Sequence, residues 1–349
     1  MASEQRIRPT EARHVTPELT TMQAIVQDEY GEADDVLRLE EIDRPQIGDD
    51  EVLLRVHAAG VDRGVWHLMT GLAYPIRLAG YGLRAPKTRV RGREVAGRVE
   101  AVGKDVTTLA PGDEVFGIGE GTFAEYACAS ADKLAPKPEN LTFEQAAAVP
   151  VSALAALQGL RDHGQVQRGQ KVLIIGASGG VGTFAVQIAK AFGAEVTGVC
   201  STTKLDMVRS IGADRVIDYK RDDIANSGQR YDLILDTGGN RSLSALRRAL
   251  TPRGTLVIVG SETGGRWLGG IDRQLRAVLL SPFVGQDLGT FVVSENRDDL
   301  IVIKELIEAG KVTPVVDRTY PLSETPAAIR HMQEGRARGK LIIDVGGSS

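Results

Sequence analysis

The chain has 349 residues, of which 42% are hydrophobic and 25% are charged, and its formal net charge at pH 7 is −4. These values are typical of a soluble globular protein of about two domains, and they exclude a disordered chain, a fibre and a disulfide-rich scaffold. The mildly acidic balance gives no reason to expect nucleic-acid binding, and no run of about 18 apolar residues predicts a membrane span. Because the chain has only two cysteines, we expect it in the reducing cytoplasm.

The first part of the chain has a β-type pattern. Residues 1–21 are polar and lack an apolar core, so we predict a flexible arm there and no signal peptide. From residue 22 to about residue 137, short alternating segments between glycine and proline turns favour a sandwich or a partly closed barrel. The predicted strands are Glu51–Ala58, Glu94–Val102, Asp113–Phe116 and Phe123–Cys128.

From Thr142 onward the pattern changes to alternating helices and strands. Thr142 stands where it can cap a helix, and a second helix is predicted at residues 152–162. Apolar strands that alternate with amphipathic helices predict a parallel sheet with both faces covered. The predicted strands are Lys171–Ile175, Glu195–Cys200, Arg215–Asp218, Asp232–Asp236, Thr255–Val259 and Phe291–Val293. Two helices that end near Gly310 and Gly335 precede a last strand at Lys340–Val345.

The most informative motif is a glycine-rich loop between the first strand of this alternation and the helix that follows. Strand, loop, helix and next strand form a βαβ unit over residues 172–199, which is typical of a dinucleotide-binding site. Small residues let a pyrophosphate approach the backbone at the helix N-terminus, where free N–H groups favour negative charge. We assign this role to Ala177, Ser178, Gly179, Gly180, Val181 and Gly182. The alternative is a tight strand–helix turn without a ligand.

The residues after the second strand of this unit indicate which dinucleotide binds. An NAD site has Asp or Glu at this place for the ribose hydroxyls, whereas this chain has Ser201, Thr202 and Lys204. Two hydroxyls and a cation suit a 2′-phosphate, so we predict NADPH as the cofactor. Tyr219, after the third strand, is placed to stack on the adenine or to contact the phosphate. The alternative is a solvated turn with an ordinary surface lysine.

Several segments besides the glycine loop carry a family resemblance. They are AAGVDRGVW (58–66), RGREVAGRVEAVG (91–103), PGDEVFG (111–117), GTFAEYACA (121–129), AAAVPVSALAALQGL (146–160), GADRVIDY (212–219) and TLVIVG (255–260). In order and spacing, the chain resembles the zinc-independent quinone-oxidoreductase branch of the medium-chain dehydrogenase/reductase superfamily. The resemblance implies a GroES-like catalytic domain from residues 22–149 and 296–349, a doubly wound Rossmann domain at 150–295, and a cofactor contact at Gly260.

The resemblance also implies that no zinc is bound. Zinc-dependent relatives have a cysteine where this chain has Asp62 and a histidine where it has Arg93, and their structural zinc lobe has four cysteines. An arginine side chain is a donor only and cannot ligate a cation. We interpret His57 and His67 as packed or surface histidines, because neither has a partner at a ligand spacing.

The chain departs from its zinc-free relatives at three positions near the expected reaction centre. Many relatives have Asn, Asp and Thr or Ser where this chain has Asp62, Val65 and Ala155, and the resemblance assigns the first and last positions to the nicotinamide end and the substrate edge. The candidate proton donors are Asp62, Tyr74 and water in the cleft, because a carboxyl group in a dry cleft can have a raised pKa. The alternative for Asp62 is a solvated turn aspartate.

The segment 63–93 contains no Asp or Glu and is rich in basic residues, which are Arg63, Arg77, Arg84, Lys87, Arg89, Arg91 and Arg93. By resemblance, the loop around residues 70–92 borders the substrate cleft, where this charge could steer an acidic substrate or a coenzyme A phosphate. A solvated basic loop is the alternative. Trp66, Tyr74 and Tyr81 either line an apolar pocket or belong to the core.

Together these observations predict an NADPH-dependent oxidoreductase that transfers a hydride to a quinone, an enone or a carbonyl compound without zinc. The alternatives are a non-catalytic NADPH-binding redox sensor or partner module, and an alcohol oxidiser that uses the same site in reverse. The resemblance also implies a homodimer in which the strand Phe291–Val293 pairs with its counterpart. The alternative is a monomer in which the helix at residues 297–309 covers this edge.

Overall fold

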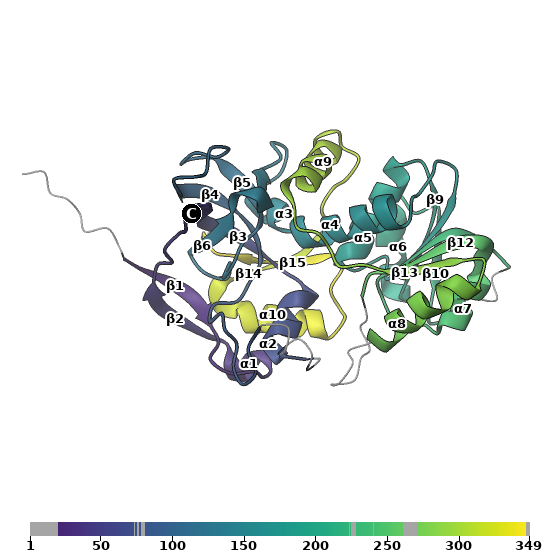
Figure 1. Ribbon diagram of the computed structural model, residues 1–349, viewed down its shortest axis with the longest axis horizontal. Helices are drawn as coiled ribbons and strands as arrows, with labels where there is room; N and C mark the ends of the chain where they lie inside the picture. Colours follow the sequence, from purple (N-terminus) through teal and green to yellow (C-terminus); the bar gives the residue numbers. More distant parts are fainter. Residues whose placement is uncertain are drawn as a thin grey trace, which may run out of the picture.

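The computed structural model describes residues 20–346, with gaps at residues 73, 75–76, 78–80, 223, 225–227, 240 and 261–270. It has one lobe rich in β-strands and one lobe built on a parallel sheet, with helix α4 (Pro150–Gln158) between them (Figure 1). Of the arm predicted at residues 1–21, residues 1–19 lie outside the described residues, and residue 21 already begins a strand.

The β-rich lobe takes strands from both ends of the chain. Its seven-stranded sheet has the order β14–β15–β3–β4–β5–β7, and β6 pairs with β3. The strand β15 (Lys340–Asp344) pairs antiparallel with β3 (Glu51–Val61) and sets Ile342 opposite Gly60. The other strands are β4 (Glu94–Val102), β5 (Glu114–Ile118), β6 (Tyr126–Ser130), β7 (Leu134–Pro136) and β14 (Val316–Pro321). The C-terminal segment therefore completes a sheet that residues near the N-terminus begin.

Several small elements of this lobe do not follow from the sequence pattern. A separate two-stranded sheet pairs β1 (Thr21–Val26) with β2 (Arg38–Asp43), and the short α1 (Ala33–Val36) lies between these strands in the chain. Helix α2 (Arg63–Thr70) buries Val65 and Met69, which are one turn apart, in a cluster with Ile329 of α10 (Thr325–Gln333). This packing places the start of α2 beside the central strand β3.

The second lobe confirms the predicted doubly wound fold. Its six strands are all parallel, in the order β10–β9–β8–β11–β12–β13. They are β8 (Lys171–Ile175), β9 (Glu195–Cys200), β10 (Arg215–Asp218), β11 (Tyr231–Asp236), β12 (Leu250–Ile258) and β13 (Asp287–Thr290). The strand order reverses between β8 and β11, and in such sheets a ligand binds at the carboxyl ends of the strands at this point.

Four helices pack on the strands of the parallel sheet, and they are α5 (Gly180–Ala191), α6 (Leu205–Ser210), α7 (Leu243–Ala249) and α8 (Ile271–Leu280). Helix α3 (Phe143–Ala147) instead packs on β3 and β4 of the β-rich lobe, and α9 (Arg297–Glu308) packs on α4 and β7. As predicted, Thr142 caps α3: its hydroxyl accepts from Gln145 N, and the side chain of Gln145 accepts from Thr142 N. No helix within the described ranges has the length and apolar character needed to cross a membrane.

The predicted strand Phe291–Val293 is wrong, because the edge strand β13 ends at Thr290. The ring of Phe291 leaves the sheet and stacks on the ring of His163, with 4.4 Å between the ring centroids. The next backbone groups bond to a side chain: Gln158 donates to Ser294 O at 2.8 Å and accepts from Ser294 N at 2.9 Å. Phe291 and Val293 therefore pack against the core outside the sheet, whereas Val292 between them is 93% exposed.

Candidate active site

The glycine loop follows β8 at the point where the strand order reverses. Gly176 has φ +81°, which a residue with a side chain rarely adopts. A Cβ atom at Gly182 would overlap the carbonyl oxygen of Gly176, so the first turn of α5 packs against the loop backbone. The loop therefore requires glycine at both positions to bring α5 close to β8.

The N-terminus of α5 is a ready site for an anion. The residue that precedes the helix is Gly179, which has no side chain to cap the first N–H groups of this 12-residue helix. Beside it, Ala177 and Ser178 are buried, whereas Gly180 and Val181 are partly exposed. Free N–H groups at a helix N-terminus bind the pyrophosphate of a dinucleotide, so the loop fits such a cofactor. These residues would hold the pyrophosphate, and Gly260 follows β12 at the same edge of the sheet.

The residues predicted to select NADPH lie after β9 and β10, but two of them already have protein partners. The ammonium of Lys204 donates to the carbonyls of Gly335 and Ala337, at 2.9 and 2.7 Å, and so joins the two lobes. The hydroxyl of Thr202 donates to Asp218 at 2.5 Å and lowers the pKa of that carboxyl group. Ser201 is partly exposed and the side chain of Tyr219 is 52% exposed. Asp218 is the last residue of β10, the third strand of the alternation, whereas the dinucleotide motif places its acid at the end of the second strand, so the sequence carries no signal for it.

A buried ion pair lies behind the glycine loop. Lys340 donates to Glu94, and the two residues are 2% and 0% exposed. Glu94 also accepts from Val151 N of α4 at 3.0 Å. Burial raises the pKa of Glu94 to about 7, and the ammonium of Lys340 opposes this rise. A Cβ at Gly180 would lie 3.0 Å from Cδ of Lys340, so the pair contacts the first residue of α5.

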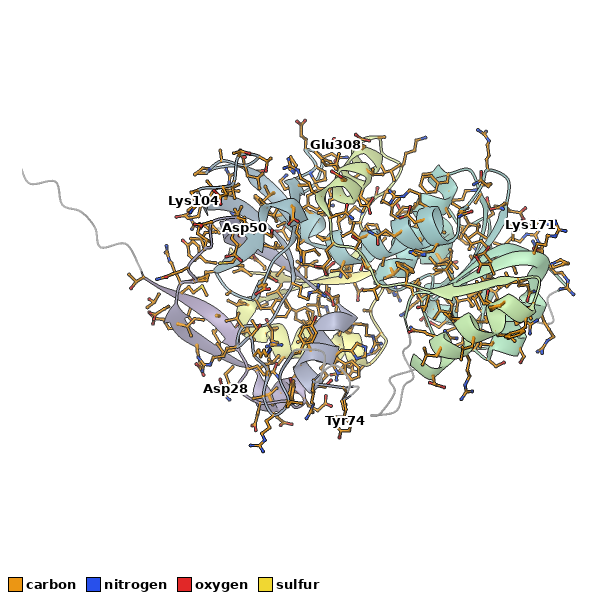
Figure 2. All side chains as sticks on the ribbon, viewed as in Figure 1. Asp28, Asp50, Tyr74, Lys104, Lys171 and Glu308 are labelled. Carbon is orange, nitrogen blue, oxygen red and sulfur yellow. The ribbon has the colours of Figure 1, made fainter. Side chains whose placement is uncertain are left out.

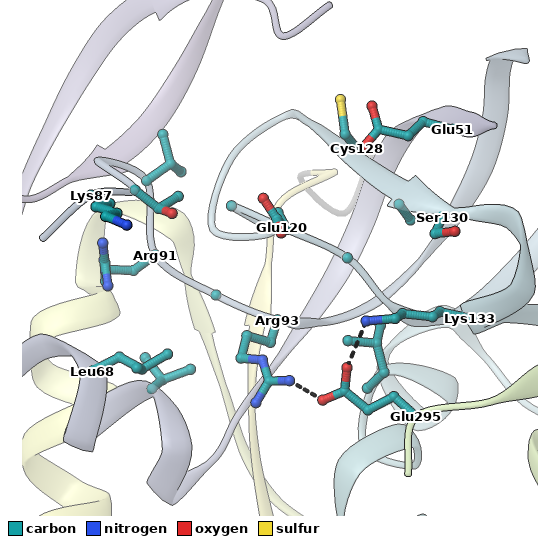
Figure 3. A pocket seen from close by; sticks show the side chains of 18 of the residues that line it. Glu51, Leu68, Lys87, Arg91, Arg93, Glu120, Cys128, Ser130, Lys133 and Glu295 are labelled. Atoms are coloured by element: carbon teal, nitrogen blue, oxygen red, sulfur yellow. Dashed lines mark hydrogen bonds and ion pairs between the residues drawn. The ribbon is translucent and has the colours of Figure 1, made fainter. Parts of the chain in front are cut away.

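A cavity of about 410 Å³ opens in the β-rich lobe, with Glu295 of the segment before α9 in its wall. Its described walls carry Val65, Leu68 and Tyr81 from the region of α2, and Ile118 and Gly119 from the end of β5. Its charged residues are Glu51, Lys87, Arg91, Arg93, Glu120, Lys133 and Glu295 (Figure 3). Such a size suits a small organic molecule.

Arg93 and Lys133 both pair with Glu295 in this wall (Figure 3). Arg93 donates to one carboxylate oxygen, and the ammonium of Lys133 lies 3.1 Å from the other. Glu295 stands two residues before α9, so this group links both lobes. By resemblance, zinc-dependent relatives have a zinc-ligating histidine at position 93. This chain has Arg93 there, and its guanidinium is bonded to the carboxylate of Glu295.

The structure does not bring the two candidate proton donors, Asp62 and Tyr74, into the cavity wall. Asp62 is 8% exposed and caps α2 by accepting from Val65 N at 3.0 Å, so it is not a solvated turn residue. Its other oxygen, Oδ2, is buried and has no hydrogen-bond partner among the described residues. Tyr74 lies at the lower edge of the molecule in Figure 2, with its ring 5.1 Å from the guanidinium of Arg77.

The sequence did not decide whether the aromatic residues of this segment line a pocket or belong to the core, and the structure separates them. Trp66 packs against the core cluster of α2 and α10, and Tyr81 lines the cavity. Val65 also lines the cavity, whereas Ala155 is buried in α4. Within the described part of the chain, no three His, Cys, Asp or Glu side chains lie close enough together to hold a metal ion.

Comparison with known proteins relates this geometry to a family. The family model for the alcohol dehydrogenase GroES-like domain matches residues 48–139, and the model described as zinc-binding dehydrogenase matches residues 211–343. The chain is 34% identical to the mitochondrial NAD(P)H oxidoreductase RTN4IP1 of Bos taurus, over 95% of this chain and 91% of that protein. The chain belongs to the medium-chain dehydrogenase/reductase family.

Other proteins match over most of this chain. The chain is 32% identical to 2-methylene-furan-3-one reductase of Solanum lycopersicum, over 92% of this chain and 79% of that protein. The structure of the quinone oxidoreductase from Coxiella burnetii superposes with a TM-score of 0.82, at 28% identity, over 93% of this chain and 99% of that chain. The predicted family and fold are therefore confirmed, and the chain is an oxidoreductase with a nicotinamide cofactor.

The Glu94–Lys340 pair makes a testable prediction about stability. Glu94→Gln leaves the ammonium of Lys340 buried without a carboxylate, so we expect a loss of about 3–5 kcal/mol in the free energy of unfolding. Adding Lys340→Met removes the unpaired charge, and the double variant should be more stable than Glu94→Gln alone. Urea denaturation followed by circular dichroism measures both changes.

The exposed pair of Lys104 and Asp49, whose side chains are 70% and 66% exposed, provides the control. Asp49→Asn should change the free energy of unfolding by less than about 1 kcal/mol. The change in the free energy of unfolding of the double variant is compared with the sum of the changes in Glu94→Gln and Lys340→Met. If the double variant shows that sum, the two residues are not coupled and the expectation is wrong.

Proposed function

We propose that the protein is an NADPH-dependent reductase that transfers a hydride to a quinone, an enone or a carbonyl compound without zinc. The main observation in support is the uncapped N-terminus of α5, joined through Lys340 to Glu94, the residue next to Arg93 in the cavity wall. The names of the relatives, an NAD(P)H oxidoreductase and a reductase of a conjugated ketone, agree with this reaction class.

The chemistry that a bound NADPH would supply is a hydride for the electron-poor carbon of the substrate. The protein supplies position and charge. The glycine loop and α5 would hold the pyrophosphate, and the cavity would hold the substrate away from bulk water. Negative charge that develops on the substrate oxygen would be stabilised by Arg93 and Lys133, which both line the cavity. Water would deliver the proton, because Asp62 and Tyr74 do not line it.

The reaction is tested by following NADPH oxidation with a panel of quinones, conjugated enones, alkenals and simple aldehydes. We expect turnover with at least one class, and we expect it to survive dialysis against a strong chelator, because Asp62 and Arg93 stand at the ligand positions of zinc-dependent relatives. Elemental analysis should find no stoichiometric zinc. Tight NADPH binding without turnover would support the non-catalytic sensor instead, and one bound zinc per chain would contradict the zinc-free mechanism.

We further expect NADPH to bind at least tenfold tighter than NADH, a difference of about 1.4 kcal/mol. No acid follows β9, and Ser201, Thr202 and Lys204 stand there instead. Lys204→Ala should remove most of this preference, as measured by fluorescence titration with both cofactors. Lys171→Ala is the matched control, because this exposed lysine starts β8 at the opposite end of the strand (Figure 2). Equal affinities of the native protein for the two cofactors would contradict the assignment.

We propose that the chain forms a homodimer through the edge strand β13 and helix α8. Exposed apolar side chains gather on α8 and the turn after it, with Leu275 at 56%, Leu279 at 70% and Phe283 at 85% exposure. The strand β13 lies at the end of the sheet order, and such an edge invites pairing with a second copy.

Light scattering should therefore give the mass of two chains. Leu279→Asp should shift it to one chain, because a charge in an apolar contact is costly. Leu39→Asp, at a 43% exposed leucine of β2 in the other lobe, should leave the mass unchanged. A native protein that runs as a monomer at micromolar concentration would rule out this assembly.

A further inference from the structure

Arg91 is a buried arginine with unpaired donors. The residue is only 6% exposed, and among the described residues its Nε and Nη2 atoms have no hydrogen-bond partner. The backbone is firmly held, because Arg91 N donates to Ile25 O at 3.3 Å and Arg91 O accepts from Phe123 N at 2.9 Å. The unpaired guanidinium is therefore a property of this position in the fold.

In the part of the chain that the structure describes, no carboxylate compensates for the burial of this charge. Burial lowers the pKa of Arg91 to about 10, and within the described residues only the phenol of Tyr30 acts in the other direction. That hydroxyl is engaged elsewhere, because it donates to the carbonyls of Tyr81 and Gly82 at 3.0 and 2.7 Å. A buried donor without an acceptor costs about 1–3 kcal/mol, and more when it is charged. Arg93, in the same wall, has Glu295, so the cavity holds one paired arginine and one unpaired arginine.

The charges of the cavity indicate what would complete the site. Its described walls carry four cations, Lys87, Arg91, Arg93 and Lys133, and three carboxylates, Glu51, Glu120 and Glu295, which leaves one positive charge in excess. The carboxylate of Glu295 is bonded to both Arg93 and Lys133. Figure 3 shows Arg91 and Lys87 together on one side of the cavity and Glu51 on the other. Arg93 and Lys133 against Glu295 already leave one positive charge, and Lys87 and Arg91 are equalled in number by Glu51 and Glu120. Among the described residues, however, no carboxylate pairs with Arg91.

We propose that Arg91 binds the carboxylate of a singly charged substrate, with Lys87 beside it, while the reducible bond lies toward Arg93. A guanidinium holds a carboxylate with two parallel hydrogen bonds. Nε and Nη2 of Arg91 are enclosed in this structure, so the guanidinium would turn toward the cavity to take up the carboxylate. A phosphate dianion would carry more charge than the cavity has in excess. The substrate is thus an unsaturated or keto acid, an inference that rests on the proposed reductase function.

The test compares an enone that carries a carboxylate with its neutral ester, using 4-oxo-4-phenylbut-2-enoate and the methyl ester. Each takes up a hydride at the carbon–carbon double bond and a proton from water, and each consumes one NADPH. We expect the ratio of kcat/KM for the acid to that for the ester to fall at least tenfold in Arg91→Met, mainly through KM. Arg91→Lys should lose less, because it keeps the charge but not the paired hydrogen bonds.

Arg84→Met is the matched control, because Arg84 belongs to the same basic segment, is exposed and does not line the cavity. It should leave the ratio within about twofold. A thermal unfolding scan adds a second readout: Arg91→Met should be at least as stable as the native protein, because it removes a buried charge that has no partner. A ratio that is the same in the native protein and in Arg91→Met would overturn the proposal, and so would a marked loss of stability without a change in the ratio.

A binding measurement tests this proposal independently of the reductase function. The saturated acid 4-oxo-4-phenylbutanoate cannot be reduced at the double bond, and calorimetry measures its binding whether or not the protein has activity. Binding that Arg91→Met abolishes would support the anion site even if neither enone is turned over, whereas no binding to the native protein would overturn it. Displacement of this acid by inorganic phosphate at matched ionic strength would contradict the preference for a single charge. If Arg91→Met does not fold, the acid-to-ester ratio and the binding of the saturated acid are measured for Arg91→Lys and Lys87→Met instead.

Discussion

The contact between Glu94 and Lys340 is the interaction on which the arrangement of the site depends. Glu94 starts β4, Lys340 starts β15, and the third partner, Val151 N, belongs to α4. The residue before this lysine, Gly339, donates to Ser178 O of the glycine loop at 2.9 Å. One buried pair therefore holds together the two ends of the β-rich lobe, the helix between the lobes and the cofactor loop. Because burying either charge without its partner would be costly, the pair also selects this arrangement over looser ones.

Outside this pair, polar side chains join the lobes by bonding to backbone groups. Gln187 of α5 donates to Thr313 O at 3.0 Å and accepts from Thr313 N at 2.8 Å. Gln158 of α4 does the same with Ser294, and Lys204 holds two carbonyls of the segment before β15. These bonds satisfy the backbone of connecting segments that have no strand partner, as buried polar groups require. They hold three connecting segments, at residues 294, 313 and 335–337, against α4, α5 and the turn after β9.

The cavity shows how one short stretch of sequence carries two different electrostatic roles. Arg91 and Arg93 are separated by Gly92, which has φ +99°. Arg93 pairs with Glu295, which Lys133 also contacts, whereas among the described residues Nε and Nη2 of Arg91 have no partner. The first arrangement stabilises the junction of the lobes. The second leaves positive charge for a ligand, at a cost to stability that a structural role would not explain.

The sequence by itself determined the doubly wound lobe, the glycine loop and the family, because these depend on local signals. Apolar strands, amphipathic helices and glycines at a strand–helix turn act within about 30 residues of one another, so β8, β9 and β10 have the predicted bounds. The tertiary structure alone decided the charged groups of the site, because their partners are distant in the chain. Glu94 meets Lys340 and Arg93 meets Glu295 only after the sheet closes, and Asp62 becomes a buried helix cap only when α2 packs on α10. The apolar run at residues 291–293 misled for the same reason, since Phe291 and Val293 pack against the core without pairing in the sheet, and Val292 is exposed.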